Sequence, residues 1–102
     1  MAPPSPAARD LAAMVQESLI TRLRRSNKDV RNLGVKKAPF VVLIGAQMPS
    51  VLAEVAFLTN KDEARLLKQS SQRQLTAQAL RDAIVKYQDS LKRVSTSGSL
   101  PR

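Results

Sequence analysis

Histidine and cysteine are both absent from this sequence of 102 residues. Without cysteine, the chain can form neither disulfides nor thiolate bonds to a metal. Without histidine, it lacks the imidazole ligands typical of catalytic zinc sites, and it also lacks the base of a His-dependent catalytic triad. These absences exclude a zinc centre with histidine or cysteine ligands, and a triad of that kind, built from this chain alone.

Aromatic residues, glycine and long apolar runs are also scarce. The only aromatics are Phe40, Phe57 and Tyr87, so no platform for stacking single-stranded bases is visible. The three glycines are scattered, which excludes a glycine-rich phosphate loop. No apolar run approaches the roughly 20 residues of a membrane-spanning helix.

Positive charge is what the sequence has in excess. The 17 Lys and Arg residues outnumber 8 Asp and Glu, giving a net charge of +9. Such a balance favours polyanions: nucleic acid, an anionic membrane surface or acidic polymers of a cell envelope. The segment from Arg22 to Lys37 is the densest, with Asp29 as its one acid. A solvated loop is the usual outcome for such a charge block, and a polyanion-binding patch is the alternative.

The N-terminal part predicts a leader and a helix. Residues 1–6 are rich in proline and are expected to be disordered, and they lack the charged and apolar regions of a signal peptide. Ser5 followed by Pro6 is typical of an N-cap and first helical residue. The helix is predicted from Ala7 to about Arg25. Its apolar face comprises Leu11, Met14 or Val15, Leu19 and Leu23.

Two more helices are predicted after residue 60. Asn60, with Glu63 three residues later, indicates the start of a short helix to about Gln69. Ser71 and Gln74 suggest a capping box for the last helix. Tyr87 belongs to the apolar stripe of that helix, so we interpret it as a core residue rather than a catalytic one. The stripe comprises Leu80, Ala83, Ile84, Tyr87, Leu91 and Val94.

Between these helices the sequence predicts two strands. Residues 40–44 are uninterrupted apolar residues, typical of a strand buried on both faces. Residues 51–57 would also suit a helix, since no Gly or Pro interrupts residues 51–69. The capping signal at Asn60 and the proline at Pro49 favour a strand instead. We therefore predict an α/β fold, a fragment of a sheet domain with three helices and two strands. Residues 7–94 form this domain portion, and residues 95–102 form a flexible tail.

Glu54 is the candidate site residue. It is the one carboxylate in the apolar stretch of residues 51–58, where burial of an isolated charge would be costly. On a strand it shares a face with Leu52 and Ala56. The position of Glu54 by itself is compatible with two roles: an exposed or ion-paired residue, and a catalytic residue.

The residues around Glu54 resemble a known family. Residues 40–44, followed by the run Met48-Pro49-Ser50-Val51-Leu52-Ala53-Glu54-Val55-Ala56-Phe57-Leu58-Thr59-Asn60, are similar to the C-terminal part of the zinc-dependent N-acetylmuramoyl-L-alanine amidases. These are bacterial cell-wall hydrolases, and the similarity covers roughly residues 11–91. The chain departs from the family pattern at Ala53, Ala56 and Thr59. Ala56 stands where glycine is usual, which places a Cβ beside the candidate carboxylate.

The resemblance implies a function and a set of partners. Such enzymes cleave the amide between N-acetylmuramic acid and L-alanine in peptidoglycan, using a zinc-activated water with the residue at the Glu54 position as general base. The family's histidine ligands lie upstream, and none occurs here, so we expect the isolated chain to be inactive and to hold no zinc. It would associate with itself or with a missing N-terminal part. The family is exported, which implies a periplasmic or extracellular location.

One alternative function remains open at this point. The chain would then be a non-enzymatic basic module that binds nucleic acid or another polyanion through Arg22 to Lys37.

Overall fold

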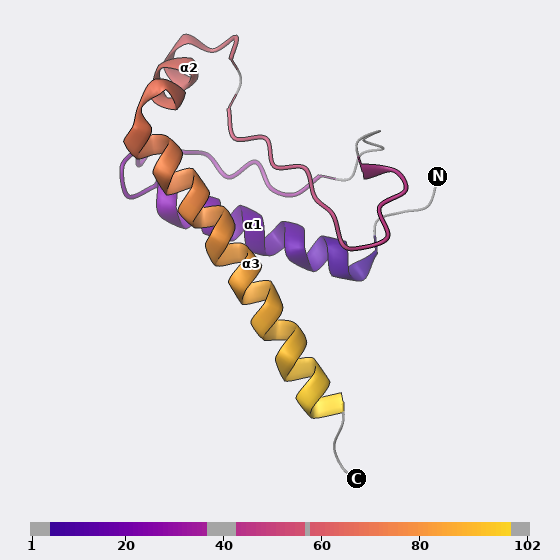
Figure 1. The fold of residues 1–102 in the computed structure, drawn as a ribbon. Helices are drawn as coiled ribbons and strands as arrows, with labels where there is room; N and C mark the ends of the chain where they lie inside the picture. Colours follow the sequence, from indigo (N-terminus) through magenta and orange to yellow (C-terminus); the bar gives the residue numbers. More distant parts are fainter. Residues whose placement is uncertain (1–4, 37–42, 57, 99–102) are drawn as a thin grey trace.

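The computed structural model describes residues 5–36, 43–56 and 58–98, with side chains described as far as residue 93. It contains three helices: α1 (Pro6–Leu23), α2 (Lys61–Lys68) and α3 (Ser70–Gly98). Figure 1 shows α1 crossing the first half of the long α3, while the second half of α3 extends beyond α1. The short α2 lies next to the beginning of α3, at the opposite end from the C-terminus.

Local signals determine where α1 begins. The Ser5 hydroxyl oxygen accepts a hydrogen bond from the Ala8 N–H at 3.1 Å, and Pro6 occupies the first helical position, where its missing N–H costs nothing. The helix ends at Leu23, two residues before the predicted end at Arg25. The prediction for this helix is therefore confirmed.

The start of α2 is also as predicted. The Asn60 side-chain oxygen accepts from the backbone N–H groups of Asp62 and Glu63, at 3.0 and 3.1 Å. These two acidic residues lie in the first turn, where the helix dipole favours negative charge. The helix then ends at Lys68, and the single residue Gln69 separates it from α3.

The predicted limits of the last helix are wrong at both ends. α3 already begins at Ser70, and the Arg73 N–H donates to the Gln69 carbonyl at 3.1 Å. Ser71 therefore lies inside the helix, where it cannot be the N-cap of a capping box with Gln74. At the other end α3 includes residues 95–98, which were predicted to belong to the flexible tail.

The core lies where α1 crosses α3. Its buried residues are Val15 and Leu19 of α1 and Ala79 and Ala83 of α3. Both alanines are completely buried, and their small side chains let the two helix backbones approach closely. The predicted apolar face of α1 is confirmed. Around this core pack Leu11, Met14, Leu23, Val51, Ala53 and Leu80.

The prediction of an α/β fold is wrong. Among the described residues there is no strand, so helices are the only regular secondary structure in this part of the chain. Leu43 and Ile44 belong to a turn, and residues 51–56 form one extended segment that pairs with no other segment of the described residues. Residues 40–42 and Phe57, which the two predicted strands also included, lie outside the described residues. An apolar run becomes a strand only where a neighbour accepts and donates its backbone hydrogen bonds. Here Val51 and Ala53 pack against the core between two helices instead.

The predicted stripe of α3 is buried over only part of its length. Ala83 is buried and Tyr87 is half-buried, but Ile84 and Leu91 are 54% and 50% exposed. The reason is that α1 covers only the first half of α3 (Figure 1). The interpretation of Tyr87 as a core residue is therefore only partly confirmed, because its side chain is half-buried.

Candidate functional site

The extended segment of residues 51–56 positions Glu54. Val51 and Ala53 pack against the core between α1 and α3, while Leu52 and Glu54 are exposed. This alternation is the one expected for extended backbone, in which successive side chains point to opposite sides. It stops after Glu54, because Val55 is 40% exposed and Ala56 is half-buried. Glu54 is therefore an exposed residue of this segment and not part of the core.

Glu54 lines a broad groove of about 1000 Å³. One wall of the groove is α1, which contributes the buried residues Val15 and Leu19. The other walls are the loop of residues 27–36, the segment of residues 50–56, and α2, which contributes Leu66 and Leu67. The groove is thus mostly apolar inside, with the Glu54 carboxylate among its acidic groups.

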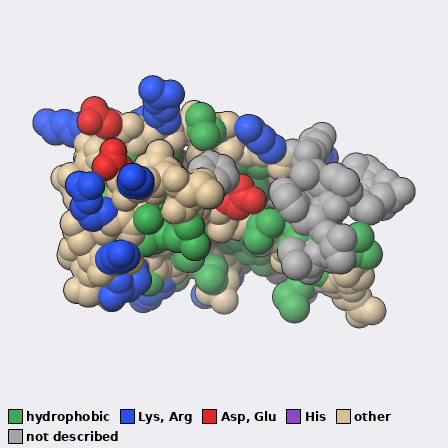
Figure 2. Space-filling model, turned by 90° about the horizontal axis from the view of Figure 1, so that it is seen from above, with side chains coloured by type: hydrophobic (Ala, Val, Ile, Leu, Met, Phe, Trp, Pro, Cys, Tyr) green, Lys and Arg blue, Asp and Glu red, His purple; other side chains and the backbone are tan. Residues whose placement is uncertain are grey.

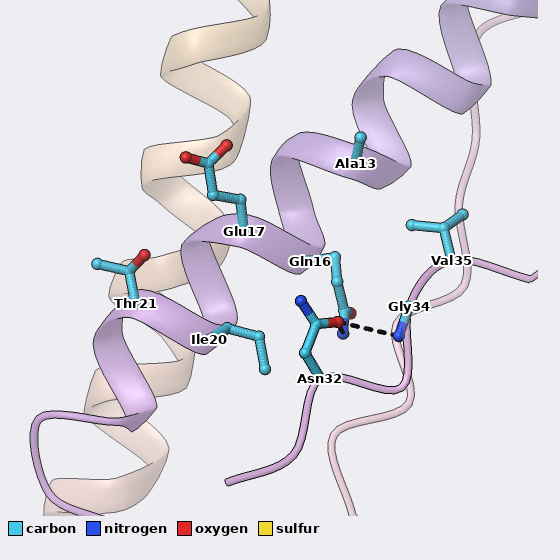
Figure 3. Close-up of a pocket in the computed structure, with 8 residues that line it drawn as sticks. All are labelled: Ala13, Gln16, Glu17, Ile20, Thr21, Asn32, Gly34 and Val35. Atoms are coloured by element: carbon cyan, nitrogen blue, oxygen red, sulfur yellow. Dashed lines mark hydrogen bonds between the residues drawn. The ribbon is translucent and has the colours of Figure 1, made fainter. Parts of the chain in front are cut away.

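Asn32 holds the loop of residues 30–36 against α1. Its side-chain oxygen accepts from the Gln16 side-chain amide and from the Gly34 N–H, both at 2.9 Å (Figure 3). Gly34 has a φ of +80°, a conformation that glycine adopts without the steric cost of a Cβ. These contacts fix the wall of the groove that Gly34 and Val35 line.

A polar network fixes α1 relative to α3. The Arg22 guanidinium donates from Nε to Asp82 Oδ2 and from Nη1 to Gln78 Oε1, both at 2.8 Å. The hydrogen bond from Arg22 lowers the pKa of the Asp82 carboxyl below its ordinary value. The sequence does not predict this network, because Arg22 belongs to the cation-rich segment from Arg22 to Lys37, which we call the basic connector. The sequence signal that points to such a network is the spacing of Gln78 and Asp82, which lie four residues apart and therefore on one face of a helix.

The described residues do not fit a zinc site. No group of three or more Asp or Glu side chains in the described ranges is arranged to hold a metal ion. Since the sequence contains neither His nor Cys, Glu54 has no neighbours of the type that complete a zinc centre. Zinc binding through histidine or cysteine ligands would need residues that this sequence does not contain.

The basic connector is partly engaged in local contacts. Arg24 Nε donates to the Val30 carbonyl at 3.2 Å, and the Ser26 hydroxyl donates to Gln72 Oε1 at 3.2 Å. Lys37, the last residue of the predicted patch, lies outside the described residues. The bond to Gln72 brings the connector next to the beginning of α3, a proximity that the sequence did not predict.

None of the described helices combines the length and apolar character needed to cross a membrane.

Comparison with known proteins decides the family. The family model described as N-acetylmuramoyl-L-alanine amidase matches residues 2–86, which include Glu54 and all of the groove. The chain belongs to this amidase family. The resemblance inferred from the residues around Glu54 is thereby confirmed at the level of the family.

Individual amidases show the same relationship. The chain is 42% identical over 77 residues to the N-acetylmuramoyl-L-alanine amidase LytC of Bacillus subtilis (strain 168), a match that covers 76% of this chain and 14% of LytC. It is 44% identical over 52 residues to the N-acetylmuramoyl-L-alanine amidase AmiA of Salmonella typhimurium, covering 51% and 18% of the two chains.

The matches span only a minor part of each relative. The chain is also 38% identical over 82 residues to the uncharacterized protein YqiI of Bacillus subtilis (strain 168), covering 80% of this chain and 37% of YqiI. The chain thus spans well under half the length of these relatives. No solved structure matches it.

Proposed function

We propose that this chain supplies the Glu54 portion of a peptidoglycan amidase, which cleaves the amide between N-acetylmuramic acid and L-alanine. The observation that carries the proposal is the family match over residues 2–86, which includes the motif around Glu54. The names of the related amidases support the same substrate class. A cell-wall substrate implies action in the periplasm or outside the cell.

Glu54 is the residue to which we assign the proton transfers. Water attacks the carbonyl carbon of the scissile amide while the Glu54 carboxylate accepts a proton from that water. The same group then donates the proton to the amide nitrogen as the C–N bond breaks, so that the products are a free carboxylate and the amine of L-alanine. A positioned carboxylate can perform both transfers, and its exposure on the groove lets a substrate approach it.

The chain alone does not provide a complete active site. Glu54 is exposed on one extended segment, and the described residues include no group of three or more acidic side chains that could hold a metal ion. The family's zinc would have to be bound by histidines of another polypeptide segment. We therefore expect the isolated chain to leave peptidoglycan intact.

A chimera tests the proposal. The 77-residue segment of Bacillus subtilis LytC that matches this chain is replaced by the corresponding residues of the chain. Purified peptidoglycan is then incubated with the chimera, with LytC and with LytC lacking the segment, and the release of new N-terminal alanine is measured. The proposal predicts release by LytC and the chimera but not by the deletion. A chimera that is folded, as judged by its cooperative melting, yet releases no alanine would contradict it.

A further inference from the structure

We propose that one end of the molecule binds a phosphodiester-linked wall polymer, such as poly(glycerol phosphate), through a surface separate from the Glu54 groove. The choice of a wall polymer rests on the proposed function, whereas the surface itself rests on charge and geometry. We call this surface the basic end. It consists of Arg24, Arg25, Lys28, Lys68 and Arg73, all of which are exposed.

The basic end is formed by two stretches that contain cations and no acids. Residues 18–28 and residues 64–81 each lack Asp and Glu entirely. They are far apart in the sequence, and neither alone is long enough to form a large surface. The cations of these stretches are Arg22, Arg24, Arg25, Lys28, Arg65, Lys68, Arg73 and Arg81.

Hydrogen bonds bring the two stretches together. The Ser26 hydroxyl donates to Gln72 Oε1 at 3.2 Å, which joins the connector to the first turn of α3. Arg73 Nη1 donates to the Leu67 carbonyl at 2.7 Å, which joins α3 to the end of α2. The end of α1, the end of α2 and the beginning of α3 therefore meet. In Figure 2 blue side chains gather on the left, the side on which α2 lies in Figure 1, with some red side chains among them.

Three cations of the basic end are available to a ligand. Arg25, Lys28 and Lys68 are exposed and form no ion pair within the described part of the chain. Arg24 and Arg73 each use one donor on a backbone carbonyl, and a guanidinium retains further donors. The nearest acid in sequence is the exposed Asp29. Positive charge thus exceeds negative charge on this surface, which favours a polyanion.

The lack of aromatic side chains among the described residues of the basic end favours a wall polymer over nucleic acid. Tyr87 is the one aromatic among the described residues, and it lies in the second half of α3, several turns beyond Arg73. Proteins that bind single-stranded nucleic acid stack its bases on aromatic side chains. The described residues of the basic end can contact phosphates but include no such platform, so a flexible polyol phosphate without bases matches them better.

Binding of fluorescently labelled poly(glycerol phosphate), measured by anisotropy at several salt concentrations, tests the proposal. The test variant carries Arg25→Gln, Lys28→Gln and Lys68→Gln, none of which removes a hydrogen bond described above. The matched control carries Lys86→Gln, Lys92→Gln and Arg93→Gln on the exposed second half of α3, with the same change in net charge. Each phosphate contact contributes about 0.7 to the slope of log affinity against log salt, so the test variant should lose about 2 from that slope.

The outcomes separate the alternatives. Weaker binding by the test variant, with affinity retained by the control, supports the proposal. Equal losses in the two variants, or no binding by the wild-type chain, would overturn it. Tighter binding to a single-stranded oligonucleotide with the same number of phosphates would also overturn it and make nucleic acid the partner. Glu54→Gln should bind the polymer normally, so the result is independent of whether Glu54 is catalytic.

Discussion

The guanidinium of Arg22 donates to the carboxylate of Asp82 across 60 residues of sequence, with an Nε–Oδ2 distance of 2.8 Å. Both side chains are mostly shielded, with 24% and 29% of their surfaces exposed. Because Arg22 lies in the last turn of α1, the contact fixes that end of the helix against α3. It thereby orients the wall of the groove that α1 provides.

This ion pair predicts a pH-dependent contribution to stability. The folded protein lowers the pKa of Asp82, mainly through the hydrogen bond from Arg22, so the contribution is complete above the ordinary aspartate pKa near 4. It is lost as the pH falls through the lowered value. Asp82→Asn should therefore melt at a lower temperature than the wild type at pH 7, and the difference should shrink below about pH 4. A difference that stays constant with pH would contradict this assignment, and Asp89→Asn on exposed α3 serves as the control.

Replacing the buried Ser18 with alanine should stabilise the protein. Its side chain is only 2% exposed, and its hydroxyl oxygen has no hydrogen-bond partner among the described residues. Removing an unsatisfied buried hydroxyl eliminates its desolvation cost, so Ser18→Ala should raise the free energy of unfolding by about 1 kcal/mol. Urea denaturation measures the change. Thr21→Ala, at an exposed position of the same helix, should change it by less than about 0.5 kcal/mol. Destabilisation by Ser18→Ala would mean that the hydroxyl is hydrogen-bonded.

Replacing Asn60, the N-cap of α2, should lower the stability of the protein. Its side-chain oxygen accepts two backbone N–H groups, so Asn60→Ala should lower the free energy of unfolding by about 1 kcal/mol. Asn60→Asp retains the acceptor and should retain most of the stability. Equal stability of the alanine and asparagine forms in urea denaturation would show that the cap contributes nothing.

The isolated chain should bind no zinc tightly. The sequence lacks His and Cys, and the described residues contain no cluster of acidic side chains arranged as ligands. After incubation with zinc and dialysis, elemental analysis should find far less than one zinc per chain. One retained zinc per chain, lost in Glu54→Gln, would contradict the account.

Helices were predictable here because their signals are local. Ser5 with Pro6, and Asn60 with its two following acidic residues, specify helix starts through contacts within one turn. The two predicted strands are not found among the described residues, because extended backbone becomes a strand only where a neighbouring segment pairs with it. The predicted start of α3 is wrong because the Gln69 carbonyl accepts a hydrogen bond from the Arg73 N–H, so the helix begins before Ser71.

The site was predictable only in part. The predicted alternation puts Leu52 on the same side as Glu54, and both are exposed, whereas Ala56, which was assigned to that side as well, is half-buried. The groove could not be predicted, because its walls come from distant segments. Nor could the basic end, since its two cationic stretches are brought together by contacts between distant residues, such as the hydrogen bond between Ser26 and Gln72.

The role of Glu54 is tested most directly by Glu54→Gln in the LytC chimera. Glutamine keeps the shape of the side chain but cannot accept the proton from water or return it to the leaving amine. We predict that alanine release from peptidoglycan falls by a factor of about 10² to 10⁴, with the melting temperature unchanged. Glu17→Gln, at an exposed position on α1, is the matched control and should release alanine at the rate of the unsubstituted chimera. Activity retained in Glu54→Gln would contradict the catalytic assignment and make Glu54 a surface residue of the groove.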